Sequence, residues 1–256
     1  MVKQLNLTLS LRNRTVPARI GLILLETDHT TELEFARHMP HDLVGVYANR
    51  IPYANPTTPD NLKRMTPMIG ERAAQILPEA DLDVVYYGCT SASFVIGDDL
   101  VAEHIRAAKP TSIVVTPTLA AVAACQHLAV SNLAVLTPYL AETSALLDPY
   151  MASNGLCVVS HACLGIEDDR IMAALDDKSL IKAAEAADHP EADALFISCT
   201  ALRAIEVVPI LEARLGKPVI TSNQAAIWYI LRHLGLPQPT RNACDLFRTL
   251  SELGQH

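Results

Sequence analysis

The chain repeats one pattern twice, and this duplication limits its possible folds more than any other feature. Four segments, each an apolar run followed by a polar turn, recur in the same order 108–113 residues later. The third pair is the clearest, because "LDVVYYGCTSA" around Cys89 returns as "ADALFISCTAL" around Cys199. Chance can supply one such match but hardly four at a nearly constant offset. The sequence therefore indicates an internal duplication.

Strand-like and helix-like segments alternate within each half. The strands are short, continuous apolar runs, which is the pattern of parallel strands buried on both faces. Segments with helical spacing separate them. We therefore predict an α/β fold of two flavodoxin- or Rossmann-like parallel sheets, in two halves related by a pseudo-twofold axis. Ligands of such sheets bind beyond the carboxyl ends of the strands, which places the active site in the cleft between the halves.

The composition excludes several classes of protein. With 256 residues and a net charge of -8, the chain is too acidic to favour a nucleic-acid partner. No apolar run approaches the roughly 18–20 residues that cross a bilayer, so we expect no membrane partner. Leu5, Leu7, Leu9 and Leu11 alternate with polar residues in a strand-like period, unlike a signal peptide. We expect a cytoplasmic protein whose six cysteines are free thiols.

The two Cys-Thr pairs mark the candidate catalytic residues. Cys89 and Cys199 each follow the third strand of their half, so we expect the two thiols to converge on one cleft from opposite sides. Two such thiols can remove a proton from one face of a carbon and return it on the other. Alternatively, one thiolate can add to an activated alkene while the other cysteine supplies a proton. Neither scheme needs a metal or an organic cofactor, and we expect none.

The residues after the two cysteines fit this chemistry. Thr90, Ser91 and Thr200 would lie at helix N-termini, where backbone N–H groups and hydroxyls hold a substrate carboxylate and stabilise an enediolate-like charge. The same positive field is expected to lower the pKa of the thiols. The structural alternative is two buried cysteines at strand ends with Thr as a helix cap. Matching positions in both halves favour the functional interpretation.

Several segments together resemble a known group of enzymes, the Asp/Glu racemase superfamily. Within it, the chain is similar over nearly its whole length to the branch that holds maleate cis-trans isomerase and arylmalonate decarboxylase. The segments that carry the resemblance are "LLETDHTTELEF", "YYGCTSAS", "VVTPT", "LTPYL" and "ISCTALRAIEVVPILE". The segments "NRIPYANPTTP" and "CTSASFVIGDD" most resemble the ectoine-utilisation proteins of this branch, which implies a role in ectoine catabolism.

The resemblance also implies an organisation and a kind of partner. The C-terminal helices of the family return to the first half, so we place the first half at 1–117 plus 222–256 and the second at 118–221. The family implies cofactor-independent chemistry on a small carboxylate substrate, in a homo-oligomer. The alternating N-terminal arm is a candidate for building such an oligomer.

Five residues carry over from the motifs of the family. Cys89 and Cys199 match the paired cysteines of the isomerases and racemases. The decarboxylase resembles this chain at the second cysteine but has glycine at the first, so Cys89 speaks against simple decarboxylation. Thr90, Ser91 and Tyr139 match the carboxylate-binding group. For Tyr139 the structural alternative is packing at a strand–helix junction.

Two positions depart from the maleate isomerases, which carry Asn at both. His29 stands at the first and Asp169 is nearest to the second, and we count both as substrate-binding residues. If those Asn residues bind the second carboxylate of maleate, this pocket does not suit it. Asp169 would instead pair with an ammonium group. The structural alternative is that Asp168 and Asp169 only cap the helix beginning "RIMAAL".

These observations predict a cofactor-independent isomerase or racemase that uses Cys89 and Cys199 at the carbon next to a carboxylate. Its substrate would be a small amino-acid-like molecule or a dicarboxylate. One alternative is a maleate cis-trans isomerase, and another is an arylmalonate-type decarboxylase in which only Cys199 acts. An alternative of another class is a small-molecule binding protein without turnover. No metal is expected, because no cluster of His, Cys and acidic residues has a standard ligand spacing.

Overall fold

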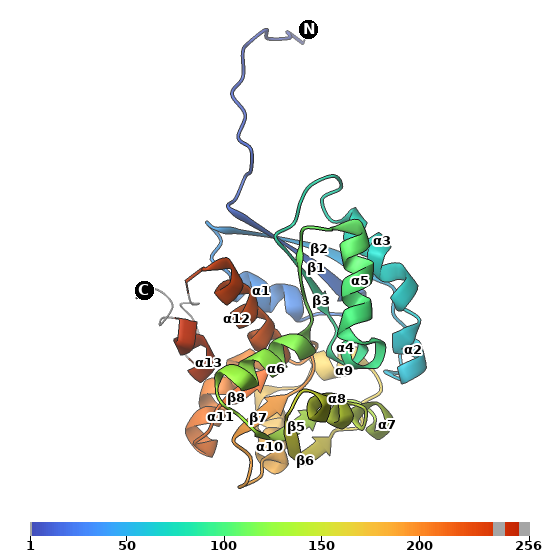
Figure 1. Ribbon diagram of the computed structural model, residues 1–256, viewed down its shortest axis with the longest axis vertical. Helices are drawn as coiled ribbons and strands as arrows, with labels where there is room; N and C mark the ends of the chain where they lie inside the picture. The colour runs from blue at the N-terminus through green and yellow to red at the C-terminus, as the bar shows by residue number, and fades with distance from the viewer. Residues whose placement is uncertain (1, 238–243, 251–256) are drawn as a thin grey trace.

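The computed structural model describes residues 2–237 and 244–250 and confirms the predicted α/β class. Two four-stranded parallel sheets form the fold, the first in the upper part of Figure 1 and the second in the lower part. Their strand orders are β2-β1-β3-β4 and β6-β5-β7-β8. The two sheets thus share one topology, which is the structural counterpart of the duplicated sequence.

The elements alternate as the sequence predicts. The strands are β1 (Ala18–Leu25), β2 (Val44–Ile51), β3 (Val84–Gly88), β4 (Ile113–Val115), β5 (Asn132–Thr137), β6 (Cys157–Cys163), β7 (Ala194–Ile197) and β8 (Val219–Thr221). The helices up to the second sheet are α1 (Thr31–His38), α2 (Pro59–Lys63), η1 (Thr66–Met68), α3 (Ile69–Gln75), α4 (Thr90–Ile96), α5 (Asp98–Ala108) and α6 (Pro117–His127). Those that follow are α7 (Ala141–Ser144), α8 (Leu147–Ser153), α9 (Asp169–Ala173), α10 (Asp177–Ala187), η2 (Ile205–Val207), α11 (Val208–Leu215), α12 (Ser222–Leu234) and α13 (Asp245–Arg248).

One apolar core runs through both halves. It joins Leu22 of β1 to Leu133 of β5, Phe196 of β7 and Trp228 of α12. A smaller core, which includes Ile23, covers the other face of the first sheet, because successive side chains of a strand point to opposite faces. The shared core fixes the two halves against each other, so the loops between them form a defined site.

The C-terminal part of the chain crosses between the halves. Helix α12 follows β8 of the second sheet and packs against α6, α1 and β3. This contact agrees with a return of the chain to the first half. The boundaries that assign 222–256 to that half stay a prediction, since 238–243 and 251–256 lie outside the described residues.

Strand β3 brings the first cysteine to the edge of its sheet. Its last residue, Gly88, pairs in register with Leu24 of β1. A Cβ atom at position 88 would lie 2.5 Å from Cδ2 of Leu24, so only glycine fits without a shift of that leucine. The close approach of the two strands sets the position from which Cys89 leaves the sheet.

The alternating N-terminal arm forms no strand. Residues 2–12 are exposed and lie outside helices and strands, and Figure 1 shows them pointing away from both sheets. Their strand-like period is not realised within the chain because no strand lies beside them to accept backbone hydrogen bonds. Among the residues described, no helix is both long and apolar enough to span a bilayer.

Candidate active site

The two cysteines meet in one pocket between the halves. Cys89 directly follows β3 and precedes α4, whereas Cys199 lies two residues beyond β7. Both are buried, with 4% and 6% of their surfaces exposed. The open space between them is small, with a cavity volume of ≈ 20 Å³, far below the range of about 300–1,000 Å³ for ligand sites. The predicted convergence of the two thiols is therefore present in the structure, in a small buried pocket between the halves.

The wall of the pocket contains most of the predicted site residues. They come from both halves and lie mainly at the carboxyl ends of strands, as the fold requires. The lining consists of Leu25, Asp28, Tyr53, Thr57, Cys89, Thr90, Ser91, Tyr139, Asp169, Met172, Cys199, Thr200 and Ala201. None of these described lining residues is Lys, Arg or His, and two of them are carboxylates.

Two hydrogen-bonded connections tie the cysteine loops to each other. The Thr200 hydroxyl donates to the carbonyl oxygen of Gly88 at 3.2 Å. The Thr90 hydroxyl donates to the Ser222 hydroxyl at 2.9 Å, and the backbone N–H of Cys199 donates to the same oxygen at 3.0 Å. The hydroxyl hydrogens of Thr90 and Thr200 are thus directed to protein atoms. Their predicted role toward a substrate carboxylate stays a prediction.

The pKa values of the two thiols are raised, so the expected lowering is wrong. Burial raises the pKa of Cys89 to about 11 and that of Cys199 to about 12. Hydrogen bonds involving Ser91 at Cys89 and the N–H of Ala201 at Cys199 oppose these shifts without cancelling them. The expected helix field is weak here, because α4 has only seven residues and Thr200 lies in a bend rather than at a helix start. Desolvation of the charged thiolate dominates.

Tyr139 presents an unsatisfied hydroxyl to the pocket. The residue lies two positions beyond β5 and is 2% exposed. Its hydroxyl is near Cys199 and Ser198 but makes no well-formed hydrogen bond to any described residue. A buried hydroxyl without a partner costs about 1–3 kcal/mol. A substrate oxygen at this point would remove that cost, which is what a carboxylate-binding residue requires.

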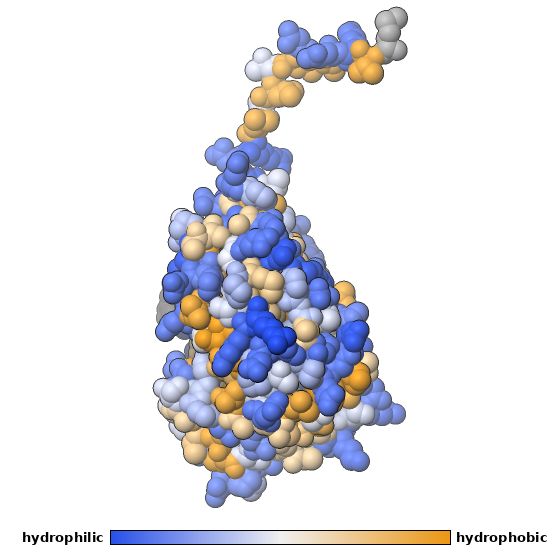
Figure 2. Space-filling model, turned by 90° about the vertical axis from the view of Figure 1, so that its right-hand side faces the viewer, coloured by the Kyte–Doolittle hydropathy of each residue, from blue (hydrophilic) through white to orange (hydrophobic). Residues whose placement is uncertain are grey.

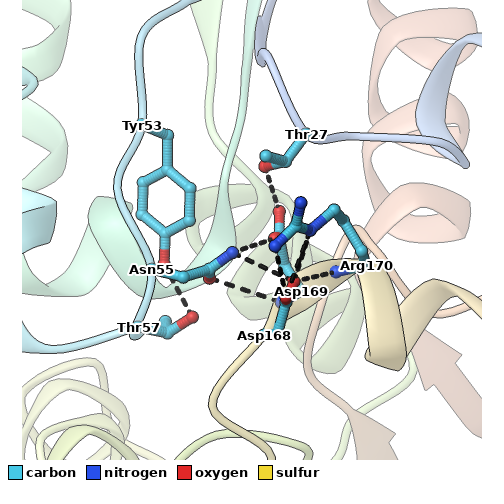
Figure 3. Close-up of polar contacts among 7 residues, drawn as sticks. All are labelled: Thr27, Tyr53, Asn55, Thr57, Asp168, Asp169 and Arg170. Carbon is cyan, nitrogen blue, oxygen red and sulfur yellow. Dashed lines mark hydrogen bonds and ion pairs between the residues drawn. The ribbon is translucent and has the colours of Figure 1, made fainter.

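Asp169 takes part in a group of hydrogen bonds that joins the two halves (Figure 3). It is 4% exposed, and its carboxylate accepts hydrogen bonds from the Thr27 hydroxyl and, at 3.0 Å, from the side-chain amide of Asn55. Asn55 also donates to Asp168, and the backbone N–H of Thr57 donates to the Glu167 carbonyl oxygen at 3.2 Å. The loop around 53–57 of the first half is therefore fastened to the loop before α9 beside the pocket.

The neighbouring residues Asp168 and Asp169 have different roles in the structure. Asp168 is the N-cap of α9, where it accepts from the backbone N–H of Arg170 at 2.9 Å and also pairs with the Arg170 side chain. The capping alternative therefore holds for Asp168. Asp169 is the first residue of that helix, and its side chain turns to Thr27 and Asn55 and lines the pocket.

His29 is the one predicted site residue outside the pocket. It is exposed and lines a separate hollow together with Arg37 and Arg203. Its neighbour Asp28 lines the pocket instead. Asp28 is buried and accepts hydrogen bonds from the N–H groups of Thr30 and Thr31 at 2.8 Å each, and burial raises its pKa. The loop turns at the start of α1 so that the aspartate points inward and the histidine outward.

Residues that sequence reasoning missed hold the second cysteine loop from the first half and from α12. The Thr30 hydroxyl donates to the Ala201 carbonyl oxygen at 2.6 Å, and the Asn223 amide donates to that of Thr200 at 3.0 Å. Asn223 also donates to the buried carboxyl of Glu34 at 2.7 Å. Ser222 and Asn223 follow the fourth strand of the second half. The rule that sites lie at carboxyl strand ends was therefore a signal that could have found them.

Comparison with known proteins agrees with this architecture. Residues 58–247 match the model of the family described as arylmalonate decarboxylase. The maleate isomerase of Nocardia farcinica is 26% identical over 242 residues, which cover 90% of this chain and 95% of that protein. The arylmalonate decarboxylase of Bordetella bronchiseptica is 32% identical over 112 residues, which cover 42% of this chain and 46% of that protein.

Solved structures show the same fold. The maleate isomerase from Pseudomonas putida S16 superimposes with a TM-score of 0.84 at 24% identity, over 91% of this chain and 99% of that one. A Nocardia farcinica maleate cis-trans isomerase with a covalently bound succinylcysteine intermediate superimposes with a TM-score of 0.82 at 24% identity, over 91% of this chain and 98% of that one. Similarity at this level concerns the arrangement of the two sheets.

Proposed function

The chain belongs to the arylmalonate decarboxylase family, and we propose that it is a cofactor-independent isomerase acting at the carbon next to a carboxylate. The observation that carries the proposal is the pair of buried cysteines, Cys89 and Cys199, in one pocket between duplicated halves. Relatives that cover most of the chain are maleate isomerases, and a cysteine of one of them is known with a covalent succinyl group.

The two cysteines exchange roles in the proposed reaction. One acts as thiolate and removes the proton from the α-carbon, which leaves an enediolate-like anion. The other, as a thiol, donates its proton to the opposite face of the same carbon. The first cysteine then holds the proton and the second is the thiolate, so the reverse direction uses the same groups in exchanged roles. Tyr139, with its unsatisfied hydroxyl, supports the substrate carboxylate in this scheme.

The charges of the pocket favour a substrate with one carboxylate and one cationic nitrogen. Asp28 and Asp169 are buried carboxylates in the wall, and no described lining residue is basic. A dicarboxylate would add two negative charges beside them in a medium where charge repulsion is strong. A cationic nitrogen next to Asp169 would offset this charge. It would also lower the thiol pKa values that burial has raised and so produce the thiolate that the reaction needs.

The physiological role in this proposal is ectoine catabolism. Support comes from the resemblance of "NRIPYANPTTP" and "CTSASFVIGDD" to ectoine-utilisation proteins. In the structure, both segments contribute to the pocket, through Tyr53 and Thr57 in the first and Cys89, Thr90 and Ser91 in the second. The substrate would be an amino acid or an N-acyl diamino acid.

A decarboxylase is the second candidate, because the matching family model carries that name. In that reaction Cys199 alone would protonate an enediolate, and Cys89 would be dispensable. Retention of a cysteine at position 89 in the pocket wall favours the isomerase.

Proton NMR in D2O tests the proposal. The wild-type protein would be incubated with small amino acids, N-acetylated diamino acids, maleate and an arylmalonate. Loss of an α-proton signal from a substrate with one carboxylate and a nitrogen supports the proposal and identifies the substrate. Conversion of maleate to fumarate contradicts the substrate part, and release of CO2 from the arylmalonate makes the decarboxylase the leading function. Ligand binding without exchange identifies a binding protein.

A further inference from the structure

The N-terminal arm, defined here as residues 2–13, carries an apolar edge that its own chain does not cover. Leu5, Leu7, Leu9 and Leu11 are 66%, 65%, 73% and 89% exposed. Figure 2 shows apolar residues spaced along this arm, outside the compact body. Isolated surface leucines are common, whereas these four stand at alternate positions of one projecting segment.

The arm has the pattern of an extended segment that buries one side. Leucines occupy every second position from 5 to 11, and Asn6, Thr8 and Ser10 fill the positions between them. Successive side chains of an extended chain point to opposite sides, so all four leucines share one side. The arm also carries Lys3 and Arg12. Its base is fixed, because Arg14 pairs with Asp83 at 2.8 Å just before β1.

A groove elsewhere on the molecule has properties that complement those of the N-terminal arm. It has a volume of ≈ 530 Å³ and lies between the start of α5, α6, α8 and α12. Leu119, Val122 and Ala123 of α6 and Tyr229 of α12 give it an apolar wall, and Asp98 and Asp99 lie in the same lining. None of the described residues that line this groove is Lys, Arg or His.

Hydrogen bonds hold the Asp98 carboxylate in place at the acidic end of the groove. Asp98 accepts hydrogen bonds from the hydroxyls of Thr116 at 2.6 Å, Thr118 at 2.9 Å and Tyr150 at 2.5 Å. These neutral donors hold the carboxylate in place without neutralising it. Asp99 is exposed beside it. A segment with basic side chains flanking a row of leucines matches an apolar groove with carboxylates at its end.

We propose that the N-terminal arm docks in the α5–α6–α8 groove of a second copy of this chain. The leucine side faces Leu119, Val122 and Ala123, and a basic side chain of the arm faces Asp98 and Asp99. The occupant is a second copy for two reasons: the arm points away from its own body, and every copy offers both surfaces. The arm is basic while the whole chain has a net charge of -8, so copies attract through this contact. Reciprocal exchange of two arms closes a dimer.

Sedimentation velocity of the full chain over a range of concentrations tests the docking. We expect a dimer for the wild type and a dissociation constant at least tenfold higher for Leu7→Asp/Leu9→Asp. The matched control Asn6→Asp/Thr8→Asp puts the same charges on the other side of the same arm and should weaken the dimer by less than threefold. A monomeric wild type at every concentration, or equal effects of the two double variants, overturns the proposal.

A charge exchange tests the groove itself. Asp99→Lys should weaken the dimer, and Lys3→Glu added to it should restore association, because Lys3 shares the side of the leucines and the ion pair is then reversed. Ala123→Arg, which fills the apolar wall, should also give a monomer with an unchanged melting temperature. A dimer that depends on the leucines but is unaffected by Asp99→Lys and Ala123→Arg shows that the arm docks elsewhere, and this contradicts the assignment of the groove.

Discussion

The hydroxyl of Thr200 donates a 3.2 Å hydrogen bond to the carbonyl oxygen of Gly88, the residue directly before Cys89. Thr200, which follows Cys199, thus holds Gly88, which precedes Cys89, in place. Ser222 completes a second connection, because it accepts from both the Thr90 hydroxyl and the N–H of Cys199. The two thiols are therefore positioned as one unit across the boundary between the halves.

Removal of the Ser222 hydroxyl should impair activity more than it impairs folding. Ser222→Ala leaves the buried N–H of Cys199 without its acceptor, which costs about 1–3 kcal/mol of stability. The loop also loses its link to Thr90, and small displacements of a reacting group reduce rates by about 100-fold. We expect kcat to fall by about 10–100-fold with little change in KM, as measured on the substrate that the NMR screen identifies.

Ser160→Ala is the matched control for this prediction. Ser160 lies in β6 and donates to the Ala187 carbonyl oxygen at 3.0 Å, away from the pocket lining. Its loss should lower the melting temperature but leave kcat within about twofold of wild type, because no contact to a cysteine loop is removed. Equal kcat values for the two variants would show that the Ser222 connection does not position the thiols.

The pocket cysteines should react slowly with iodoacetamide near neutral pH. Burial raises the pKa of Cys89 to about 11 and that of Cys199 to about 12, and only the thiolate reacts. Their alkylation, followed by peptide mass mapping, should therefore accelerate about tenfold per pH unit from pH 8 to pH 10. The exposed Cys157 and Cys163 serve as internal references. Complete alkylation of Cys89 within the time needed for Cys157 at pH 7 would contradict the desolvated pocket.

Glu34 should make the folded state less stable as the pH rises. Burial raises its pKa from 4.5 to about 8, against the hydrogen bonds from Asn223 and the N–H of Ile205. An unfolded chain releases this proton above pH 4.5, whereas the folded chain keeps it up to about pH 8, so raising the pH favours unfolding. Glu34→Gln should flatten the fall of the melting temperature between pH 5 and pH 8. Asp28, whose pKa is shifted in the same direction, contributes the remaining slope.

Glu206→Gln tests the electrostatic part of this shift. The negative charge of Glu206, which pairs with Arg37 at 2.8 Å, contributes to the raised pKa of Glu34, though less than burial does. Its replacement should therefore reduce the pH dependence of melting by less than Glu34→Gln does. A wild-type protein whose stability rises steadily from pH 5 to pH 8 would show that Glu34 is ionised in the folded state.

Asp169→Asn should change which substrates bind. The variant keeps a side-chain oxygen for Thr27 but loses the negative charge beside the pocket. We expect the affinity for a substrate with a cationic nitrogen to fall by about tenfold or more, and weak binding of a dicarboxylate to improve, as measured by calorimetry. Asp168→Asn is the control, since Asp168 caps α9 outside the pocket lining and asparagine caps a helix about as well as aspartate. Equal effects of the two variants on ligand affinity would contradict a role for Asp169 in specificity.

The sequence carried enough information for the fold and for the convergence of the cysteines. Duplicated apolar runs predict two sheets of one topology, and the carboxyl-edge rule then brings Cys89 and Cys199 together. Both inferences rest on local patterns that repeat. The placement of Tyr139 and Asp169 in the wall also follows from the ends of their elements.

The remaining features depend on contacts between distant segments, which local patterns do not encode. The direction of the thiol pKa shifts was predicted wrongly because burial by the opposite half outweighs the local field at a short helix. Ser222 and Glu34 reach the Cys199 loop from more than 20 residues away along the chain. His29 lies outside the pocket because the turn before α1 directs Asp28 inward in its place.

Deuterium incorporation at the α-carbon of the identified substrate, for each cysteine variant in D2O, tests the central claim most directly. Wild type and Cys125→Ala, in which a buried cysteine outside the pocket is removed, should incorporate deuterium at equal rates and interconvert the two stereoisomers. Cys89→Ala and Cys199→Ala should each abolish interconversion, because each removes one of the two proton-transferring groups. Full interconversion by either single variant would contradict the two-cysteine account.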